Sequence, residues 1–224
     1  MPSLDTLQLL VRRAARALAR HGLVHAYGHC SARIDAGSFL VCAAQPMGLI
    51  RPGEAGAVVP VEGALPDGVL GEVRIHQQIY KRRPDVNGIV RSMPMKAMTL
   101  STLGLTPRPR HGFGSYFAPQ PPLWDDPLLL RSDEQAAALA HTLGPAPAIL
   151  MRGNGVVTAA ESLEKAVVLT WYLEDTARVE LECLSVEDAQ AGRILTPEQC
   201  AVRATGQGRI FERMWDYLTA GDPE

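Results

Sequence analysis

The sequence lacks a strong excess of charge of either sign. Its 224 residues include 22 Lys and Arg against 24 Asp and Glu, which gives a formal net charge of −2. Proteins that bind nucleic acid gather phosphates with a basic surface, so we expect no nucleic-acid partner. The hydrophobic content of 46% is enough for one sizeable core in a chain of this length.

The sequence also lacks a membrane-spanning run and a disulfide pattern. No stretch approaches the roughly 18 consecutive apolar residues of a membrane helix. The first 20 residues place arginines within an amphipathic pattern, which is unlike a signal peptide. The four cysteines show no CxxC spacing, and a chain of this size can fold without disulfide bonds. We therefore expect a cytoplasmic protein with reduced thiols and no membrane partner.

Hydrophobic spacing predicts helices and short strands in mixed order. Apolar residues recur at helical spacing from Leu4 to Leu18, with Ser3 or Asp5 as an N-cap and Gly22 at the C-terminal end. Residues 24–61 break into short segments separated by Gly and Pro, as strands do. The pattern then predicts helices at 72–83, 94–103, after Ser132, at 161–183 and from Thr196 towards Leu218, and strands at 87–91, 148–151 and 156–159.

Two further features bear on the architecture. The stretch from Thr106 to Pro127 has no period, and a loop of that length in a compact domain is often functional. No repeat or linker divides the chain, so we predict a single domain over 1–224, with 184–224 as a C-terminal helical extension. Because helices and strands do not alternate strictly, we predict an α/β fold of the α+β-like kind, with antiparallel strand pairs flanked by helices.

Four segments in one order resemble the class II aldolase/adducin family. They are GLVHAYGHCSARID, GEVRIHQQIYKRRPDVNGIVRSMP, AILMRGNGVV and EKAVVLTWYLEDTARV, and the resemblance covers roughly residues 5–183. It implies a three-layer αβα sandwich with a central, largely antiparallel sheet. It also implies a small-molecule substrate, anionic in character, and a homo-oligomer of the tetrameric kind. GLVHAYGHCS and WDDP further resemble the family's aromatic dicarboxylate decarboxylases.

This chain departs from the family where the family binds zinc or another divalent metal through three histidines. Arg91 and Met93 stand in the places of the paired histidines, and Asn154 stands in the place of the third. A guanidinium is not a metal ligand, and Met and Asn are poor substitutes. We therefore predict no metal or other cofactor. Arg91 would instead bring a permanent positive charge to the same place.

The resemblance also assigns roles to other polar residues. Glu72 stands where the family has its acid/base glutamate, and His76 matches the histidine one helical turn later. In Gly28-His-Cys-Ser31, His29 replaces an asparagine that holds the substrate's anionic group. We expect His29, Ser31, His111 and Asn154 to bind substrate, with Glu72 and Arg91 as the catalytic residues.

Each of these residues also has a simpler structural interpretation. A carboxylate at residue 72 is favoured near a helix N-terminus whatever its function, and His76 is more simply a buried packing residue. A buried Arg91 requires an anion, and a salt bridge to Glu72 would supply one. Such a pair would make Glu72 a weaker base, which counts against its catalytic role.

Three functions remain open from the sequence. The first is a lyase that performs carbon–carbon cleavage, decarboxylation or dehydration of a small carboxylated substrate through an enolate-like intermediate. The second is a non-catalytic, adducin-like interaction module. The third is a metal-dependent lyase with a relocated ligand set, drawn from His25, His29, Glu72, His76 and His111.

Overall fold

A seven-stranded sheet forms the centre of the molecule. The computed structural model describes residues 2–186 and 193–224. The sheet order is β3-β2-β1-β4-β7-β6-β5, and all neighbouring pairs are antiparallel except β5 with β6. The largely antiparallel sheet is thus confirmed. The strands are β1 (His29–Arg33), β2 (Ser38–Val41), β3 (Ala57–Pro60), β4 (Gly88–Ser92), β5 (Leu123–Trp124), β6 (Ala148–Met151) and β7 (Gly155–Ala160).

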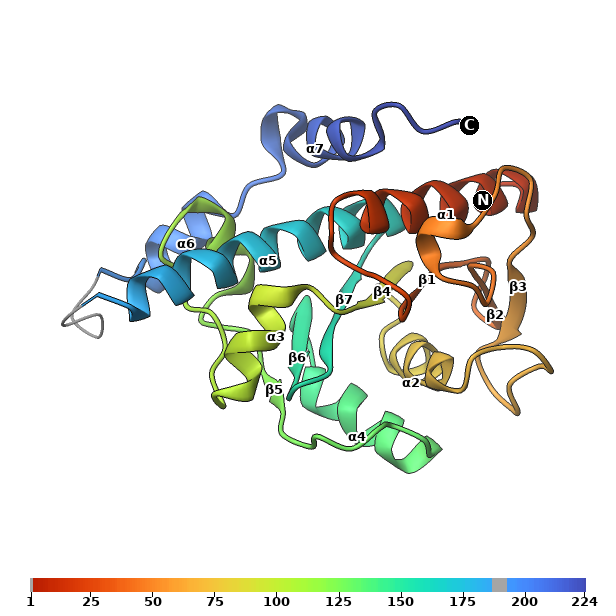
Figure 1. The fold of residues 1–224 in the computed structure, drawn as a ribbon, viewed down its shortest axis with the longest axis horizontal. Coiled ribbons are helices and arrows are strands. Elements are labelled where there is room, and N and C mark those ends of the chain that lie inside the picture. The colour runs from red at the N-terminus through yellow and green to blue at the C-terminus, as the bar shows by residue number, and fades with distance from the viewer. Residues whose placement is uncertain (1, 187–192) are drawn as a thin grey trace.

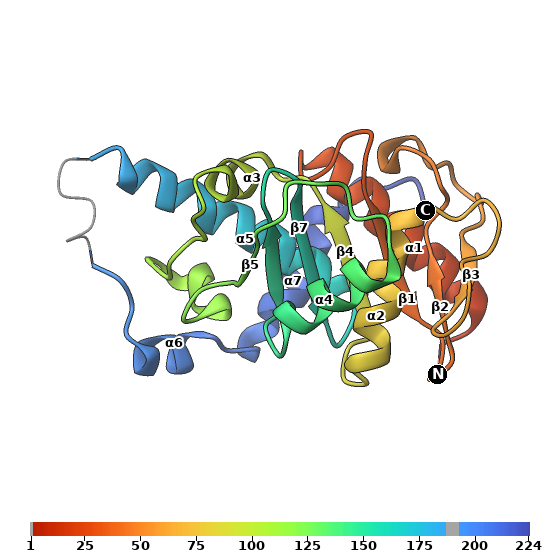
Figure 2. The same ribbon diagram turned by 90° about the horizontal axis from the view of Figure 1, so that it is seen from below.

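Helices cover both faces of this sheet. On one face lie α1 (Leu4–Arg20) and α5 (Leu163–Leu184), and on the other lie α2 (Arg74–Arg82) and α4 (Asp133–Leu143) (Figure 1). The view from below shows α2 and α4 in front of the strands (Figure 2). Two clusters of buried apolar side chains fill the two spaces between sheet and helices. The three-layer αβα sandwich is therefore confirmed.

Local signals in the sequence set several helix starts. The Ser3 hydroxyl accepts a hydrogen bond from the Thr6 amide and caps α1, as predicted. Ser132 and Gln135 form the predicted capping box of α4. The helix α3 (Met95–Thr102) follows β4 after Pro94 and packs against α5. Arg74 begins α2 only after a 3-10 turn, η2 (Gly71–Val73), so Glu72 lies in that turn.

The structure corrects two predictions about irregular segments. The stretch 106–127 contains a 3-10 helix, η3 (Gly112–Phe117), and the two-residue β5, both too short to give a period. The predicted last helix is two helices, α6 (Pro197–Arg203) and α7 (Ile210–Thr219), with a short 3-10 turn η5 (Gln207–Arg209) between them. Gly208 has a φ of 70°, which interrupts the helical path. Another short turn, η1 (Met47–Leu49), precedes β3.

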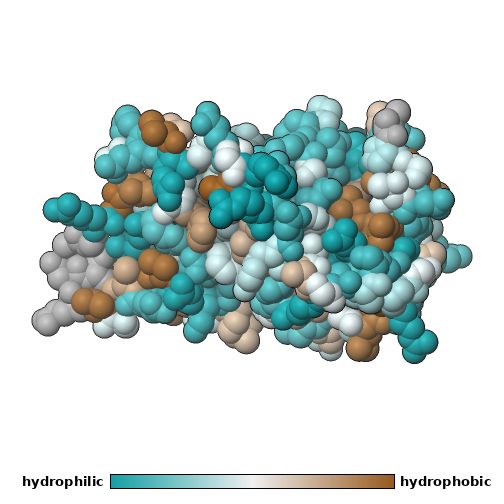
Figure 3. All heavy atoms as spheres, turned by 90° about the horizontal axis from the view of Figure 1, so that it is seen from above, coloured by the Kyte–Doolittle hydropathy of each residue, from teal (hydrophilic) through white to brown (hydrophobic). Residues whose placement is uncertain are grey.

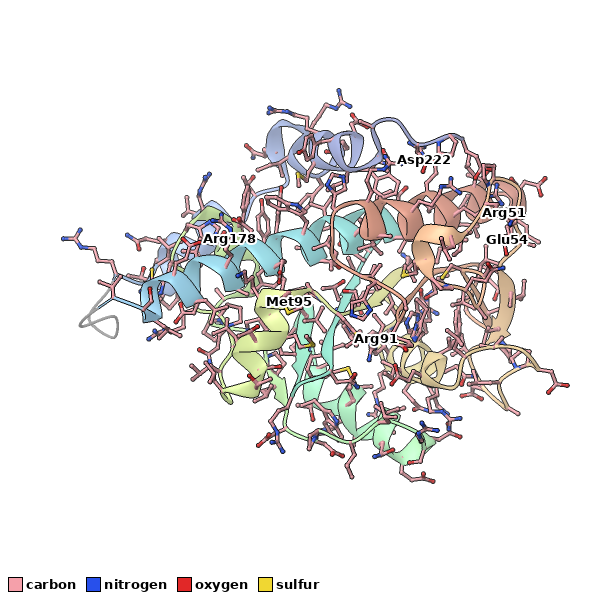
Figure 4. The ribbon with its side chains drawn as sticks, viewed as in Figure 1. Arg51, Glu54, Arg91, Met95, Arg178 and Asp222 are labelled. Carbon is pink, nitrogen blue, oxygen red and sulfur yellow. The ribbon has the colours of Figure 1, made fainter. Side chains whose placement is uncertain are left out.

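The end of the chain is held against its first helix. Helix α7 lies outside α1 and α5, on the side away from the sheet (Figure 1). Beyond it, Glu224 forms an ion pair of 2.6 Å with Arg12, and Asp222 forms one of 2.6 Å with Arg16. Figure 4 shows Asp222 beside α1. We call these contacts the C-terminal clasp. In the described part of the chain, no helix is long and apolar enough to cross a membrane.

Candidate functional site

The candidate site forms where β1 and β4 run side by side in the middle of the sheet. His29 lies directly opposite Arg91 in the antiparallel register, so the two side chains project from the same face. Ile89, two residues before Arg91, belongs to the apolar cluster on the side of α2 and α4, which places both side chains on that side. Gly28 permits the backbone before β1 to lie close to β4, since a Cβ at residue 28 would lie 2.9 Å from the Arg91 carbonyl oxygen.

Four buried side chains form a continuous hydrogen-bond network beneath the site. His29 Nδ1 lies 2.9 Å from His76 Nε2, and His76 Nδ1 lies 2.6 Å from the Ser31 hydroxyl. Ser31 Oγ is also 2.9 Å from the Tyr80 hydroxyl, which donates to the Ser31 carbonyl oxygen over 3.2 Å. We call Tyr80, Ser31, His76 and His29 the histidine network. It joins α2 to β1.

Both imidazoles of the histidine network are neutral at ordinary pH. Burial, with a smaller effect of the Arg91 charge, lowers the pKa of His76 to about 3. Burial also lowers the pKa of His29 well below its usual value, and His76 and Arg91 act in the same direction. Both effects disfavour a charged ring. Neutral imidazoles can each donate one hydrogen bond and accept one.

Arg91 is the buried charge of the site. Its side chain is only 2% exposed, and its Nε lies 3.1 Å from Glu72 Oε2, whose side chain is 25% exposed. The competing interpretation of Arg91, a salt bridge to Glu72, is therefore present in the structure. Burial lowers the pKa of Arg91, and Glu72 opposes this shift. Figure 4 places Arg91 at the centre of the molecule, near α2.

The remaining hydrogen-bonding atoms around Arg91 are not all used. Arg91 Nη2 donates to Asn154 Oδ1 over 2.9 Å. Because a guanidinium only donates, this contact fixes the amide orientation of Asn154. Arg91 Nη1, Asn154 Nδ2 and His29 Nε2 are buried without a hydrogen-bond partner. Buried atoms of this kind need a partner, which a ligand or a water molecule can supply.

A small cavity adjoins His29 at one side of this cluster. It has a volume of about 190 Å³ and is lined by His29, by residues 41–44 and 55–57, and by residues 67–70 with Val73. A larger cleft of about 970 Å³ lies near Arg33, Asp35 and Glu161. That cleft touches Tyr80 but none of the residues with unpaired atoms. We therefore place the site at the end of the smaller cavity that His29 lines, with Arg91 opposite His29 on the neighbouring strand.

Two residues expected to bind substrate lie elsewhere. Ser31 is fully buried, and its hydroxyl is engaged by His76 and Tyr80. It supports the site from below and does not face the cavity. His111 lies beside α5, with its Nε2 3.6 Å from Asp175 Oδ2, and none of the contacts in the described residues joins it to Arg91. By contrast His29, Glu72, Arg91 and Asn154 come together.

The residues present do not fit a metal ion. In ranges 2–186 and 193–224, no three His, Cys, Asp or Glu side chains are grouped as metal ligands require. His25 is exposed, and His29 and His76 direct nitrogens at each other over 2.9 Å. The cationic Arg91 occupies the centre of the site, where it would repel a cation.

The contact of Tyr80 with Ser31 was not predicted from the sequence. The signal for it was present, because Tyr80 follows His76 by four residues and thus lies on the same face of α2. Likewise Ser31 follows His29 by two residues and faces the same side of β1. What the sequence could not provide was the distance between that helix face and that strand.

The comparisons with known proteins agree with this fold. The sequence profile of the class II aldolase and adducin N-terminal domain matches residues 10–181. A 3,4-dihydroxyphthalate decarboxylase from Arthrobacter keyseri is 31% identical over 193 residues, covering 79% of this chain and 78% of that protein. A second, from Terrabacter sp., is 26% identical and covers 81% of this chain and 83% of its own length.

Comparison with solved structures also gives class II aldolases as similar folds. L-fuculose-1-phosphate aldolase from Thermus thermophilus matches with a TM-score of 0.72 and 27% identity, covering 85% of this chain and 100% of that one. An aldolase II superfamily protein from Pseudomonas syringae matches with a TM-score of 0.81 and 21% identity, covering 97% and 92%. The second likeness concerns the fold alone.

Proposed function

This chain belongs to the class II aldolase and adducin family, and we propose that it is a decarboxylase-type lyase for a small carboxylated substrate. Arg91 takes over the charge-stabilising task that a metal ion has elsewhere in the family. The observation that carries the proposal is the Arg91 guanidinium, which is buried in the site with Nη1 unpaired. Glu72 already supplies an anion for Arg91 Nε, but a buried donor such as Nη1 is costly unless an acceptor completes it, and a substrate oxygen would do so.

The proposed chemistry uses three side chains. The carbon–carbon bond to the leaving carboxylate breaks, carbon dioxide departs, and the electron pair passes to an enolate-like oxygen. Arg91 Nη1 and Asn154 Nδ2 donate to that oxygen, and such donors are most effective when they are buried, as these two atoms are. The proton that the carbon needs comes from solvent and is relayed by Glu72, whose side chain is 25% exposed. The ion pair with Arg91 counts against a larger acid/base role for Glu72, so its part in the proposal is this relay.

The relatives support a lyase over the interaction module. The two relatives described are named as decarboxylases, and the Thermus protein is named as an aldolase. An interaction module would be expected to show a large apolar patch. On the face seen from the side of α7, hydrophobic residues are separated by hydrophilic ones (Figure 3).

The test is turnover of 3,4-dihydroxyphthalate. Turnover is measured from the carbon dioxide released and from the product separated by chromatography. We expect Arg91→Met to lower kcat/KM by about 100-fold or more, as removal of a charge-stabilising donor does. The matched control is Arg131→Met, which removes an exposed arginine. Glu72→Gln should also lower kcat. Full activity of Arg91→Met would contradict the proposed role.

A further inference from the structure

We infer that His29 Nε2 is a hydrogen-bond acceptor that selects substrates bearing a hydroxyl group in addition to the carboxylate. The inference starts from the histidine network and rests on the proposed function only for the carboxylate. It adds a specificity-determining residue to the site and narrows the substrate class to hydroxycarboxylic acids.

The direction of every hydrogen bond in the network follows from Tyr80. Its hydroxyl has a single hydrogen, which goes to the Ser31 carbonyl oxygen because a carbonyl only accepts. The contact of 2.9 Å between the two hydroxyl oxygens must then use the hydrogen of Ser31. Ser31 Oγ therefore has no hydrogen left for His76, and it accepts one from His76 Nδ1.

The hydrogen positions on His76 and His29 follow from the direction of the Ser31 contact. A neutral His76 with its hydrogen on Nδ1 has a lone pair on Nε2. That lone pair accepts from His29 Nδ1 over 2.9 Å. A neutral His29 with its hydrogen on Nδ1 has a lone pair on Nε2, and this nitrogen is buried without a partner. The arrangement is the only one that satisfies all four contacts with neutral rings.

The site thus offers one acceptor, on His29, and unpaired donors on Arg91, its register partner on the neighbouring strand, and on Asn154, which is bound to Arg91. Arg91 Nη1 and Asn154 Nδ2 are unpaired donors suited to a carboxylate or enolate oxygen. A carboxylate oxygen placed at His29 Nε2 would be repelled, because both atoms are hydrogen-bond acceptors and neither carries a hydrogen. A hydroxyl can donate to it, so a ligand with both groups satisfies the site. A ligand without the hydroxyl leaves a buried acceptor unpaired, which lowers affinity.

The tautomer of His29 is measured first, because this measurement needs no ligand. Long-range proton–nitrogen NMR spectra of protein labelled with ¹⁵N-histidine report which ring nitrogen carries the hydrogen. Signals are assigned by substituting each histidine in turn. We expect Nε2 of His29 to be unprotonated. In Tyr80→Phe the Ser31 hydrogen is free to point at His76, and we expect His29 to shift towards the Nε2-protonated form. Tyr217→Phe, at an exposed tyrosine, is the control.

Binding is tested by calorimetry with benzoate, 3,4-dihydroxybenzoate and 3,4-dimethoxybenzoate. We expect the dihydroxy acid to bind roughly tenfold or more tightly than either of the others. Tyr80→Phe should reduce this preference, whereas Tyr217→Phe should keep it.

The outcomes separate the two proposals. A protonated His29 Nε2 in the unsubstituted protein, or equal binding of the three acids, would overturn the inference and leave the proposed function standing. Absence of binding by all three acids, together with no turnover, would instead remove the proposed function and the substrate class with it. The tautomer result would then still decide the direction of the network.

Discussion

Arg91 and Asn154 are joined by a hydrogen bond of 2.9 Å that links the C-terminal end of β4 to the turn between β6 and β7. This turn is tight, with Gly153 at a φ of 66° and Gly155 at a φ of 89°. The Asn154 amide therefore reaches Arg91 only because glycines flank it. The position of a functional side chain here depends on backbone conformations that other residues rarely adopt.

Gly155→Ala should separate this pair. A Cβ at residue 155 would collide with the carbonyl oxygen of Ser92 and lie 3.0 Å from Cα of Met93. Together with the positive φ, we expect a loss of about 2 kcal/mol or more in the free energy of unfolding. Gly206→Ala is the control, because nothing lies within 4 Å of a Cβ there. Equal stability of the two variants by urea denaturation would contradict this reading of the turn.

The buried imidazole of His76 should make stability depend on pH. Its pKa is about 3 in the folded protein and about 6.5 in an unfolded chain. Between these values the unfolded chain binds more protons, so stability is fully present above about pH 6.5 and falls as the pH drops towards 3. We expect a slope of roughly 1.4 kcal/mol per pH unit from this group.

His76→Gln should make that slope smaller between pH 5 and 6.5, as measured by urea denaturation at several pH values. His141→Gln, at an exposed histidine of α4, should leave it unchanged. An unaltered slope in His76→Gln would show that the ring is not held neutral by burial.

The C-terminal clasp should contribute stability that is lost in acid. The hydrogen bond from Arg12 is the largest of the effects that lower the pKa of Glu224 to about 2. The carboxylate therefore stabilises the folded protein above about pH 4.5 and ceases to do so as the pH falls towards 2. We expect Glu224→Gln to cost about 1–2 kcal/mol at pH 7 and to lower the Tm by about 2–8 °C.

A matched control for the clasp is Glu182→Gln, which removes an exposed carboxylate whose contact with Arg178 is 3.4 Å. Surface pairs of that kind contribute little. The two variants should converge in Tm near pH 2.5. If Glu224→Gln and Glu182→Gln had equal Tm values at pH 7, the clasp would have no measurable effect.

Chelation should leave the proposed activity unchanged. Since Arg91 occupies the centre of the donor set, we expect dialysis against EDTA to alter kcat/KM by less than about twofold. Elemental analysis of untagged protein should find well under one metal equivalent per chain. About one equivalent, lost in His29→Asn, would instead support the relocated metal site.

The sequence predicted the elements whose signals are local. Helix α1 and the capping box at Ser132 follow from side chains within a few residues of each other. The break between α6 and α7 was missed although Gly206 and Gly208 signalled it, because the flanking segments are both helical. Strand β5 has two residues and exists through its parallel pairing with β6, which no local pattern reveals.

Of the site residues named from the sequence, the structure brings His29, Glu72, Arg91 and Asn154 together, and the sequence predicted only some of the contacts between them. The cost of burying Arg91 pointed to an anion, and Glu72 is that anion. The contact of Tyr80 with Ser31 joins positions 49 apart in the chain, so it requires the packing of α2 on β1. His111 was placed near the substrate by its loop, but that loop packs against α5.

The C-terminal clasp also orders events in time. Arg12 and Glu224 are 212 positions apart, and a ribosome adds roughly 5–20 residues per second. The arginines of α1 are therefore synthesised about 10–40 s before the carboxylates that pair with them. During that interval, the outer side of α1 presents unpaired cations to whatever meets the nascent chain.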